Sequence, residues 1–234
     1  MNIFGRKEPK PGRHKIFNLI ILDESGSMQS IQEETMVGLK SVFSSIRDGM
    51  EQFPDQEHSV SLISFSSEKV KEILWNAPVG KIPSDFTKKY SPDGGTPLYD
   101  AIGFSLKKLQ KLLGSLSSDG YNVLVTILTD GEENCSENFK FSQIKGMIEE
   151  LEVGPWTFAF IGASLNAYEV AKNLSIRNAM SFEADKQGID KLFSITREAN
   201  FRFMKGISNK DEDWNAQEGF FDLTFEDKTE EKPK

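Results

Sequence analysis

The sequence predicts an α/β protein with a doubly wound, mostly parallel sheet, one antiparallel edge strand and helices on both faces. Three short and nearly continuous apolar runs, at residues 15–23, 122–130 and 156–162, are typical of strands that are covered on both faces. Between these runs, apolar residues recur at steps of three and four, as they do along one side of a helix. Strands that alternate with helices in this way indicate a parallel-dominated sheet.

The first strand, residues 15–23, leads into a long amphipathic helix. Apolar residues recur from Met36 to Phe53 at helical spacing. Ser30 stands three residues before Glu33, and this spacing predicts a capping box at the start of the helix.

A hairpin supplies the antiparallel edge strand. Residues 59–66 and 70–75 read as two strands joined by a short polar link. Because a parallel crossover needs far more chain than this link offers, the two strands are expected to be antiparallel. Residues 76–97, rich in Pro, Gly, Ser and Lys, then predict a long loop with room for a short helix.

The rest of the chain continues the alternation of helices and strands. The expected elements are a helix over 98–116, a strand over 122–130, a helix over 140–152, a strand over 156–162, a helix near 164–174, a strand over 179–182 and a helix near 188–205.

Length and charge suggest one domain with two tails. The chain has 234 residues, and we expect a basic N-terminal arm at 1–14, one domain at 15–205 and an acidic tail at 206–234. Residues 211–234 carry nine Asp or Glu against three Lys, which favours disorder. The alternative is that the segment GFFDLTF, with Phe221, Leu223 and Phe225 in alternation, forms an edge strand or a docking peptide.

Several classes of protein are disfavoured by composition. No basic stripe with interleaved aromatic residues is present, so no nucleic-acid binding is expected. The single cysteine, Cys135, excludes an intramolecular disulfide and a multi-cysteine zinc site, and His14 and His58 are too few for zinc. The cysteine count favours a reduced, cytoplasmic setting. The apolar run near the start is too short to span a membrane and lacks a cleavage site, so we expect no signal peptide and no membrane segment.

Oxygen-bearing side chains gather where the predicted strands end. Asp23 and Asp130 each close an apolar strand, and the carboxyl ends of parallel strands meet at one rim of the sheet. Ser25 and Ser27 follow Asp23 in a D-x-S-x-S pattern. The loop Ser-Pro-Asp-Gly-Gly-Thr-Pro adds the hydroxyl of Thr96, and its two glycines allow close backbone approach.

Two carboxylates and three hydroxyls form a hard, all-oxygen ligand set. Such a set suits Mg²⁺, with Mn²⁺ or Ca²⁺ as alternatives, and does not suit zinc or copper. Magnesium is octahedral, so five protein groups, some acting through water, leave at least one position open. A carboxylate from a protein partner, an Asp or a Glu, is the natural sixth ligand.

Neighbouring residues have simpler explanations. Thr129 and Gly131 are expected to shape the turn around Asp130, and Asp100 to cap or brace its helix. We expect solvated side chains at Glu132 and Glu133, a passive thiol at Cys135 and a strand-opening residue at His58.

The motifs DESGSM, GGTPLYDA and TDGEEN stand in the order found in von Willebrand factor A-type (VWA) domains with a metal-ion-dependent adhesion site (MIDAS), which residues 15–205 resemble. The resemblance implies direct metal ligation by Ser25, Ser27 and Thr96. It also implies that Asp23 and Asp130 act through water or orient the hydroxyls. The wording of the motifs is similar to bacterial intracellular members such as tellurite-resistance VWA proteins, which implies a link to stress response.

Three functions follow as hypotheses. The favoured one is a non-catalytic module that binds a protein through a metal ion and a partner carboxylate. The second is a magnesium-dependent phosphoryl-transfer or hydrolase enzyme with Asp23 as nucleophile. Against it, such phosphatases resemble D-x-D whereas residue 25 is Ser, and neither a P-loop nor a credible serine–histidine pair is present. The third is a scaffold whose metal site is unused.

Overall fold

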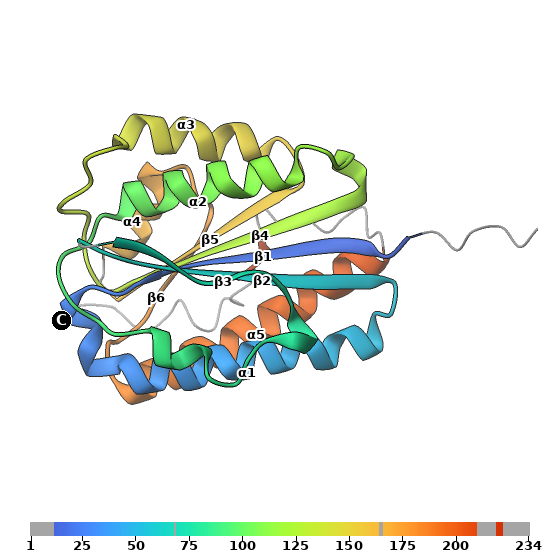
Figure 1. Cartoon of the computed structure of the whole chain (residues 1–234), viewed down its shortest axis with the longest axis horizontal. Coiled ribbons are helices and arrows are strands. Elements are labelled where there is room, and N and C mark those ends of the chain that lie inside the picture. Colours follow the sequence, from blue (N-terminus) through green and yellow to red (C-terminus); the bar gives the residue numbers. More distant parts are fainter. Residues whose placement is uncertain (1–11, 68, 164–165, 210–218, 222–234) are drawn as a thin grey trace, which may run out of the picture.

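The computed structural model describes residues 12–67, 69–163, 166–209 and 219–221. In this part of the chain, six strands form one sheet in the order β3-β2-β1-β4-β5-β6 (Figure 1). All neighbouring strands are parallel except β2 and β3, which form the expected antiparallel hairpin at one edge. The predicted fold class is therefore confirmed.

The elements follow the predicted order. The strands are β1 (His14–Asp23), β2 (Gln56–Ser66), β3 (Lys69–Pro78), β4 (Tyr121–Thr129), β5 (Trp156–Gly162) and β6 (Asn178–Ser181). The helices are α1 (Gln32–Gln52), α2 (Leu98–Leu113), α3 (Phe141–Glu152), α4 (Ala167–Asn173) and α5 (Lys186–Asn209). Short 3-10 turns are η1 (Gly26–Ile31), η2 (Val79–Lys81), η3 (Phe86–Lys89) and η4 (Ser118–Gly120).

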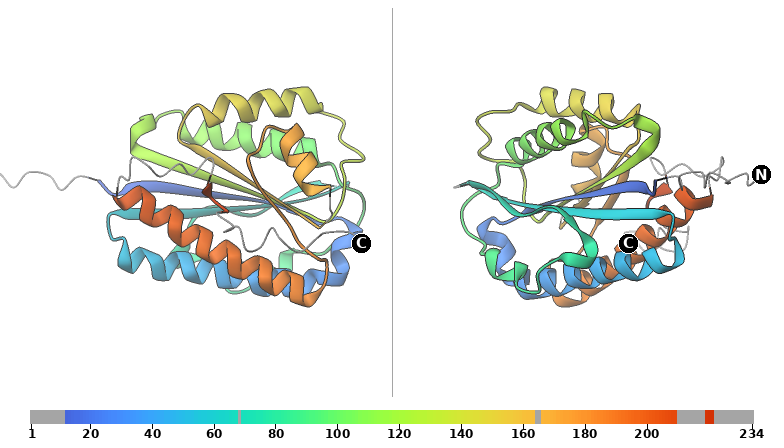
Figure 2. Two further views of the ribbon diagram at one scale, coloured as in Figure 1. Left: turned by 180° about the vertical axis from the view of Figure 1, so that it is seen from behind. Right: turned by 45° about the vertical axis from the view of Figure 1, so that its right-hand side comes forward.

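Helices cover both faces of the sheet. Helices α1 and α5 lie on one face, and α2, α3 and α4 lie on the other (Figures 1 and 2). Alternate residues of β1 enter the two cores: Ile16, Ile20 and Leu22 pack on the α1 and α5 side, whereas Leu19 and Ile21 pack on the other. This explains why the sequence of the strand is apolar at almost every position.

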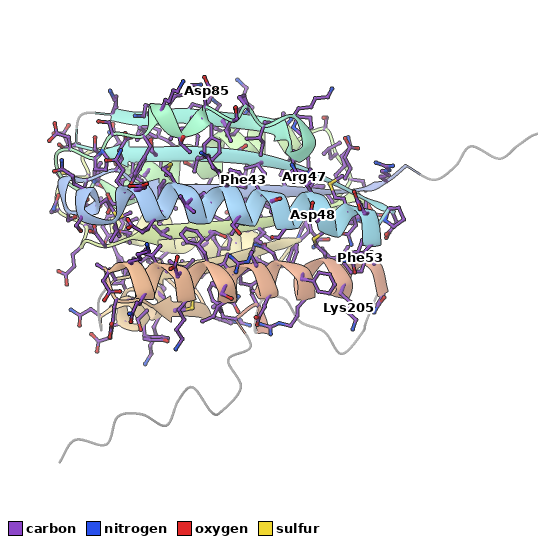
Figure 3. All side chains as sticks on the ribbon, turned by 90° about the horizontal axis from the view of Figure 1, so that it is seen from below. Phe43, Arg47, Asp48, Phe53, Asp85 and Lys205 are labelled. Atoms are coloured by element: carbon purple, nitrogen blue, oxygen red, sulfur yellow. The ribbon has the colours of Figure 1, made fainter. Side chains whose placement is uncertain are left out.

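Helices α1 and α5 run side by side across their face of the sheet (Figure 3). Gly38 of α1 allows this close approach, because a Cβ atom at this position would lie 1.8 Å from the ring of Phe193 in α5. Near the other end of α1, the ring centroids of Phe53 and Phe201 are 5.4 Å apart.

A buried polar network ties the amino end of β2 to α5. The Asn18 amide lies 3.3 Å from His58 Nδ1, and His58 Nε2 lies 3.0 Å from Gln56 Oε1. Gln56 in turn donates to the backbone oxygen of Met204 at 2.6 Å and to Ser208 Oγ at 2.7 Å. Burial, followed by the charge of nearby His14, lowers the pKa of His58 to about 4.

The predicted capping box is wrong. Helix α1 begins at Gln32, its N-cap position is Ile31, and no side chain caps it. The chain first forms η1, in which the Ser30 hydroxyl donates to the backbone oxygen of Ser27 at 3.4 Å. The tight turn after β1 thus takes up the residues that the capping-box pattern assigned to the helix start.

The C-terminal part of the described chain packs against the core. Helix α5 extends beyond its predicted end to Asn209, and the side chains of Phe220 and Phe221 are buried. Both residues lie in a turn rather than in a strand, and Phe220 N–H donates to Asn178 Oδ1 at 3.0 Å. Leu223, Phe225 and most of the predicted basic arm lie outside the described residues. Among the helices that are described, none combines the length and the hydropathy of a membrane span.

Candidate metal centre

The parallel strands end at one rim of the sheet, on the left in Figure 1. Hydrogen bonds and close approaches bring the five predicted site residues together there. Strands β1 and β4 are neighbours, with Leu22 paired to Leu128, so Asp23 and Thr129 end side by side. The loop before α2 brings Thr96 to the same rim, where its backbone oxygen accepts a hydrogen bond from Asn134 N–H.

A chain of short hydrogen bonds joins the D-x-S-x-S turn to Asp130. Ser25 N–H donates to Asp23 Oδ1 at 2.7 Å, and the hydroxyl oxygens of Ser25 and Ser27 are 3.1 Å apart. Ser27 Oγ donates to Asp130 Oδ1 at 2.6 Å. Since this uses the one proton of the Ser27 hydroxyl, a hydrogen bond between the two hydroxyls has Ser25 as its donor, and the lone pairs of Ser25 Oγ stay available for a cation.

Thr96 faces the same space as Asp23. A Cβ atom at Gly131 would lie 3.1 Å from Thr96 Oγ1 and 3.9 Å from Asp23 Oδ2, so both oxygens border this glycine. Asn134 bonds both backbone polar groups of Thr96. Thr96 N–H donates to Asn134 Oδ1 at 2.9 Å, and Asn134 N–H donates to Thr96 O at 3.2 Å.

The charge of the cluster favours a bound cation. Asp23 is fully buried, and this burial raises its pKa to about 6, despite hydrogen bonds from Thr129 and Ser25 that act in the opposite direction. The negative charge of Asp130 raises the pKa of Asp23 further, and burial also raises the pKa of Asp130. Within the described ranges, neither carboxylate forms an ion pair. A divalent ion between them would offset this repulsion and desolvation.

The cluster is open on one side. Asp23, Ser25 and Thr96 are buried, whereas Ser27 is exposed and Asp130 is half-buried. In the part of the chain that the structure describes, no group of three or more His, Cys, Asp or Glu side chains could hold a metal. The candidate site therefore depends on its hydroxyls, and its donor chemistry fits Mg²⁺ rather than zinc.

Sequence reasoning missed part of the support for this cluster. Thr129 does shape the turn through Gly131, as expected, but its hydroxyl also donates to Asp23 Oδ2 at 2.6 Å. The expectation that Glu133 is solvated is wrong. Its carboxylate accepts from Tyr99 N–H at the start of α2 and from the backbone N–H groups of Cys135 and Ser136.

Glu132 matches its expected role, whereas Asp100 does not cap its own helix α2. Asp100 accepts hydrogen bonds from three successive backbone N–H groups at 137–139 and so braces the rim loop. Glu132 is exposed and accepts from the Asn166 amide at 3.2 Å.

Comparisons with known proteins support the fold. No model of a protein family and no curated protein sequence matches the chain. Among solved structures, the chain is similar to the PilB minor pilin from Streptococcus sanguinis, with a TM-score of 0.59 and 14% identity, over 85% of this chain and 64% of the pilin. It is also similar to the SpRpn10 VWA domain, with a TM-score of 0.55 and 11% identity, over 75% of this chain and 92% of that domain.

A third similar structure is the pilus adhesin SpaC from Lactobacillus rhamnosus GG in its open conformation, with a TM-score of 0.56 and 14% identity. The similarity covers 86% of this chain but 31% of the adhesin. The chain thus spans less than two thirds of the pilin and of the adhesin, whereas it spans most of the length of the isolated VWA domain. It has a VWA-like fold.

Proposed function

We propose that this chain is a non-catalytic protein-binding module of the MIDAS type, in which a divalent metal ion accepts a carboxylate from a protein partner. The observation that carries the proposal is the meeting of Asp23, Ser25, Ser27, Thr96 and Asp130 at one rim of a VWA-like fold. The buried and unneutralised Asp23 carboxylate supports a cation at this place.

The five residues would have different roles in binding the ion. Ser25, Ser27 and Thr96 would offer their oxygens to Mg²⁺, and Asp130 would orient the Ser27 hydroxyl through the hydrogen bond already present. Because only two of the five groups carry charge, a bound ion would keep electrophilic character toward an outside acid. The exposure of Ser27 and Asp130 defines the direction from which that acid arrives.

The geometry gives less support to an enzyme. Asp23 is fully buried, and each of its oxygens already accepts a hydrogen bond, from Ser25 and from Thr129. A nucleophile must reach its substrate, and this side chain has no open face. His58 is bonded to Asn18 and Gln56 at the amino ends of the strands, away from the rim.

A titration with Mg²⁺ alone tests the metal site. A ligand that binds the folded state at a hundred times its dissociation constant stabilises it by about 2.7 kcal/mol. For a domain of this size we therefore expect the melting temperature to rise by about 5 to 10 °C. Ser27→Ala should lose this response, whereas Ser30→Ala, on the same turn, should keep it because Ser30 bonds only within the turn. Equal responses in the two variants would refute the proposed site.

Partner capture tests the second half of the proposal. Proteins recovered from a cell extract on the wild type, but lost with chelator and lost with Thr96→Ala, would be the metal-dependent partners. Replacing each surface Asp and Glu of such a partner by Asn and Gln should then identify one carboxylate on which binding depends. A partner that binds equally well with all of its carboxylates neutralised would contradict the carboxylate mechanism. Likeness of the motifs to those of tellurite-resistance proteins makes a bacterial stress-response complex the first place to look.

A further inference from the structure

Glu24 lies between two proposed ligand positions, Asp23 and Ser25, yet it does not face the site. Its side chain is 2% exposed, and both carboxylate oxygens accept hydrogen bonds from groups outside the site. Oε1 accepts hydrogen bonds from Lys71 Nζ and from Ser91 N–H, both at 2.5 Å. Oε2 accepts from Ser64 Oγ at 2.6 Å.

These contacts join three segments. Lys71 belongs to the edge strand β3, Ser64 to β2, and Ser91 to the loop that leads to Thr96. Further hydrogen bonds attach the same loop to the turn after β1: Tyr90 Oη to Asp23 O at 2.6 Å, Asp93 N to Glu24 O at 2.8 Å and Gly26 N to Gly94 O at 3.0 Å. The loop carrying Thr96 is thus held along the D-x-S-x-S turn, with Glu24 at the centre of the contact.

We infer that Glu24 and Lys71 are positioning residues for the proposed metal site. They hold the Thr96 loop against Ser25 and Ser27 before a metal ion arrives. The ion therefore does not have to order the loop, which raises its affinity. This inference rests on the proposed function, and it assigns a role to the edge strand, which supplies none of the five proposed ligand residues.

Lys71 supplies the positive charge that stabilises the buried Glu24 carboxylate. A buried carboxylate is strongly unfavourable without a cation and hydrogen-bond donors, and removing one partner of such a pair leaves an uncompensated charge. In Lys71→Met, Glu24 loses its cationic partner and is expected to turn toward water, which pulls the turn and the Ser91 segment apart. No proposed metal ligand is altered by this change.

The first test compares the Mg²⁺ midpoints of thermal stabilisation in the wild type and three variants. Loss of groups that support metal ligands typically weakens metal affinity by about 10- to 100-fold, so we expect at least a tenfold higher midpoint in Lys71→Met. Lys71→Arg should stay within about threefold of the wild type. The double variant Glu24→Gln with Lys71→Met should recover part of the loss, because its amide keeps the shape without a charge.

A matched control separates positioning from general stability. Lys108→Met removes the exposed ion pair between Lys108 of α2 and Glu72 of β3, two elements that do not include the Thr96 loop. Ile148→Val removes a methylene group from the hydrophobic core at α3 and so lowers the general stability of the protein. Both should keep the wild-type midpoint. If Lys71→Met also kept it, or if Ile148→Val shifted it equally, the inference would be overturned.

The second test does not need metal. In chelator, amide hydrogen exchange at Gly94, Gly95 and Thr96 should be at least tenfold faster in Lys71→Met than in the wild type, and unchanged in Lys108→Met. Unchanged exchange in Lys71→Met would overturn the inference. A wild type that does not respond to Mg²⁺ would instead refute the proposed function, while the exchange rates would still decide whether Lys71 orders the loop.

Discussion

The buried Asp23 carboxylate leads us to expect that a neutral side chain at this position stabilises the metal-free protein. In Asp23→Asn, the amide oxygen can still accept from Ser25 N–H. The amide nitrogen can donate to Thr129 Oγ1, which is also 3.0 Å from the backbone oxygen of Gly131 and can donate there. The main change is therefore the loss of a buried charge.

The size of the effect follows from the pKa. Asp23 is shifted from 3.8 to a pKa of about 6, chiefly by desolvation. One pKa unit corresponds to about 1.4 kcal/mol, so ionised Asp23 costs the folded state about 3 kcal/mol at neutral pH. Since burying an amide has its own cost, we expect Asp23→Asn to raise the free energy of unfolding by about 1 to 3 kcal/mol.

The pH dependence has a definite sign. Because the folded-state pKa of Asp23 exceeds the unfolded-state value, the folded protein holds a proton that the unfolded chain lacks between about pH 6 and pH 4. The Asp23 contribution to the stability of the wild type therefore becomes more favourable as the pH falls through this range. The advantage of Asp23→Asn should shrink accordingly and nearly vanish at about pH 4.

Urea unfolding in EDTA and in saturating Mg²⁺ measures these differences. In Mg²⁺ the order should reverse, because the wild type binds the ion and Asp23→Asn binds it poorly. Asp48→Asn, at an exposed position on α1 (Figure 3), serves as the control and should change stability by less than about 0.5 kcal/mol. If Asp23→Asn were less stable than the wild type in EDTA at pH 7.5, the reasoning about an unneutralised buried charge would be wrong.

Two further predictions concern the scaffold. Gly38→Ala should lower the free energy of unfolding by about 1 to 3 kcal/mol, because its Cβ would overlap the ring of Phe193. Gly146→Ala should raise it by about 0.5 to 1 kcal/mol, because Gly146 lies in helix α3 and no atom lies within 4 Å of an added Cβ. Thermal unfolding compares the two variants, and equal effects would contradict the packing argument. In the Asp23→Asn background, stability should fall by about 3 kcal/mol between about pH 6.5 and pH 4, because the unfolded chain protonates His58 before the folded protein does. Urea unfolding should show a flatter pH profile for His58→Gln, and an unchanged slope would exclude His58 as the source.

The fold was predictable because its signals are local. Every apolar residue of β1 packs in one of two cores, so the hydrophobic pattern alone indicates a covered strand. The start of β2 was not predictable in this way. Gln56 and His58 are polar but buried, and the partner of Gln56 at Ser208 is 152 residues away. Single-sequence reasoning therefore placed the start of the strand at 59.

The site also combines features with a local sequence signal and features that depend on distant contacts. Strand ends and motif order suffice to place Asp23 and Asp130 at one rim. The supporting contacts of Glu133 and Asn134 depend on the path of the loop after β4, which no local pattern encodes. The incorrect helix start has a related cause, because the Ser27 hydroxyl bonds Asp130, 103 residues away, and the chain forms a 3-10 turn around that contact.

Among the five rim residues, all in the described part of the chain, Asp23, Ser25 and Thr96 are buried, so Ser27 and Asp130 present the cluster to the outside. An ion held there could accept a single acidic side chain at a time, so each copy of the chain would engage one partner through it. Cross-linking of several partners into a larger complex would then require several copies of this chain or a separate contact surface.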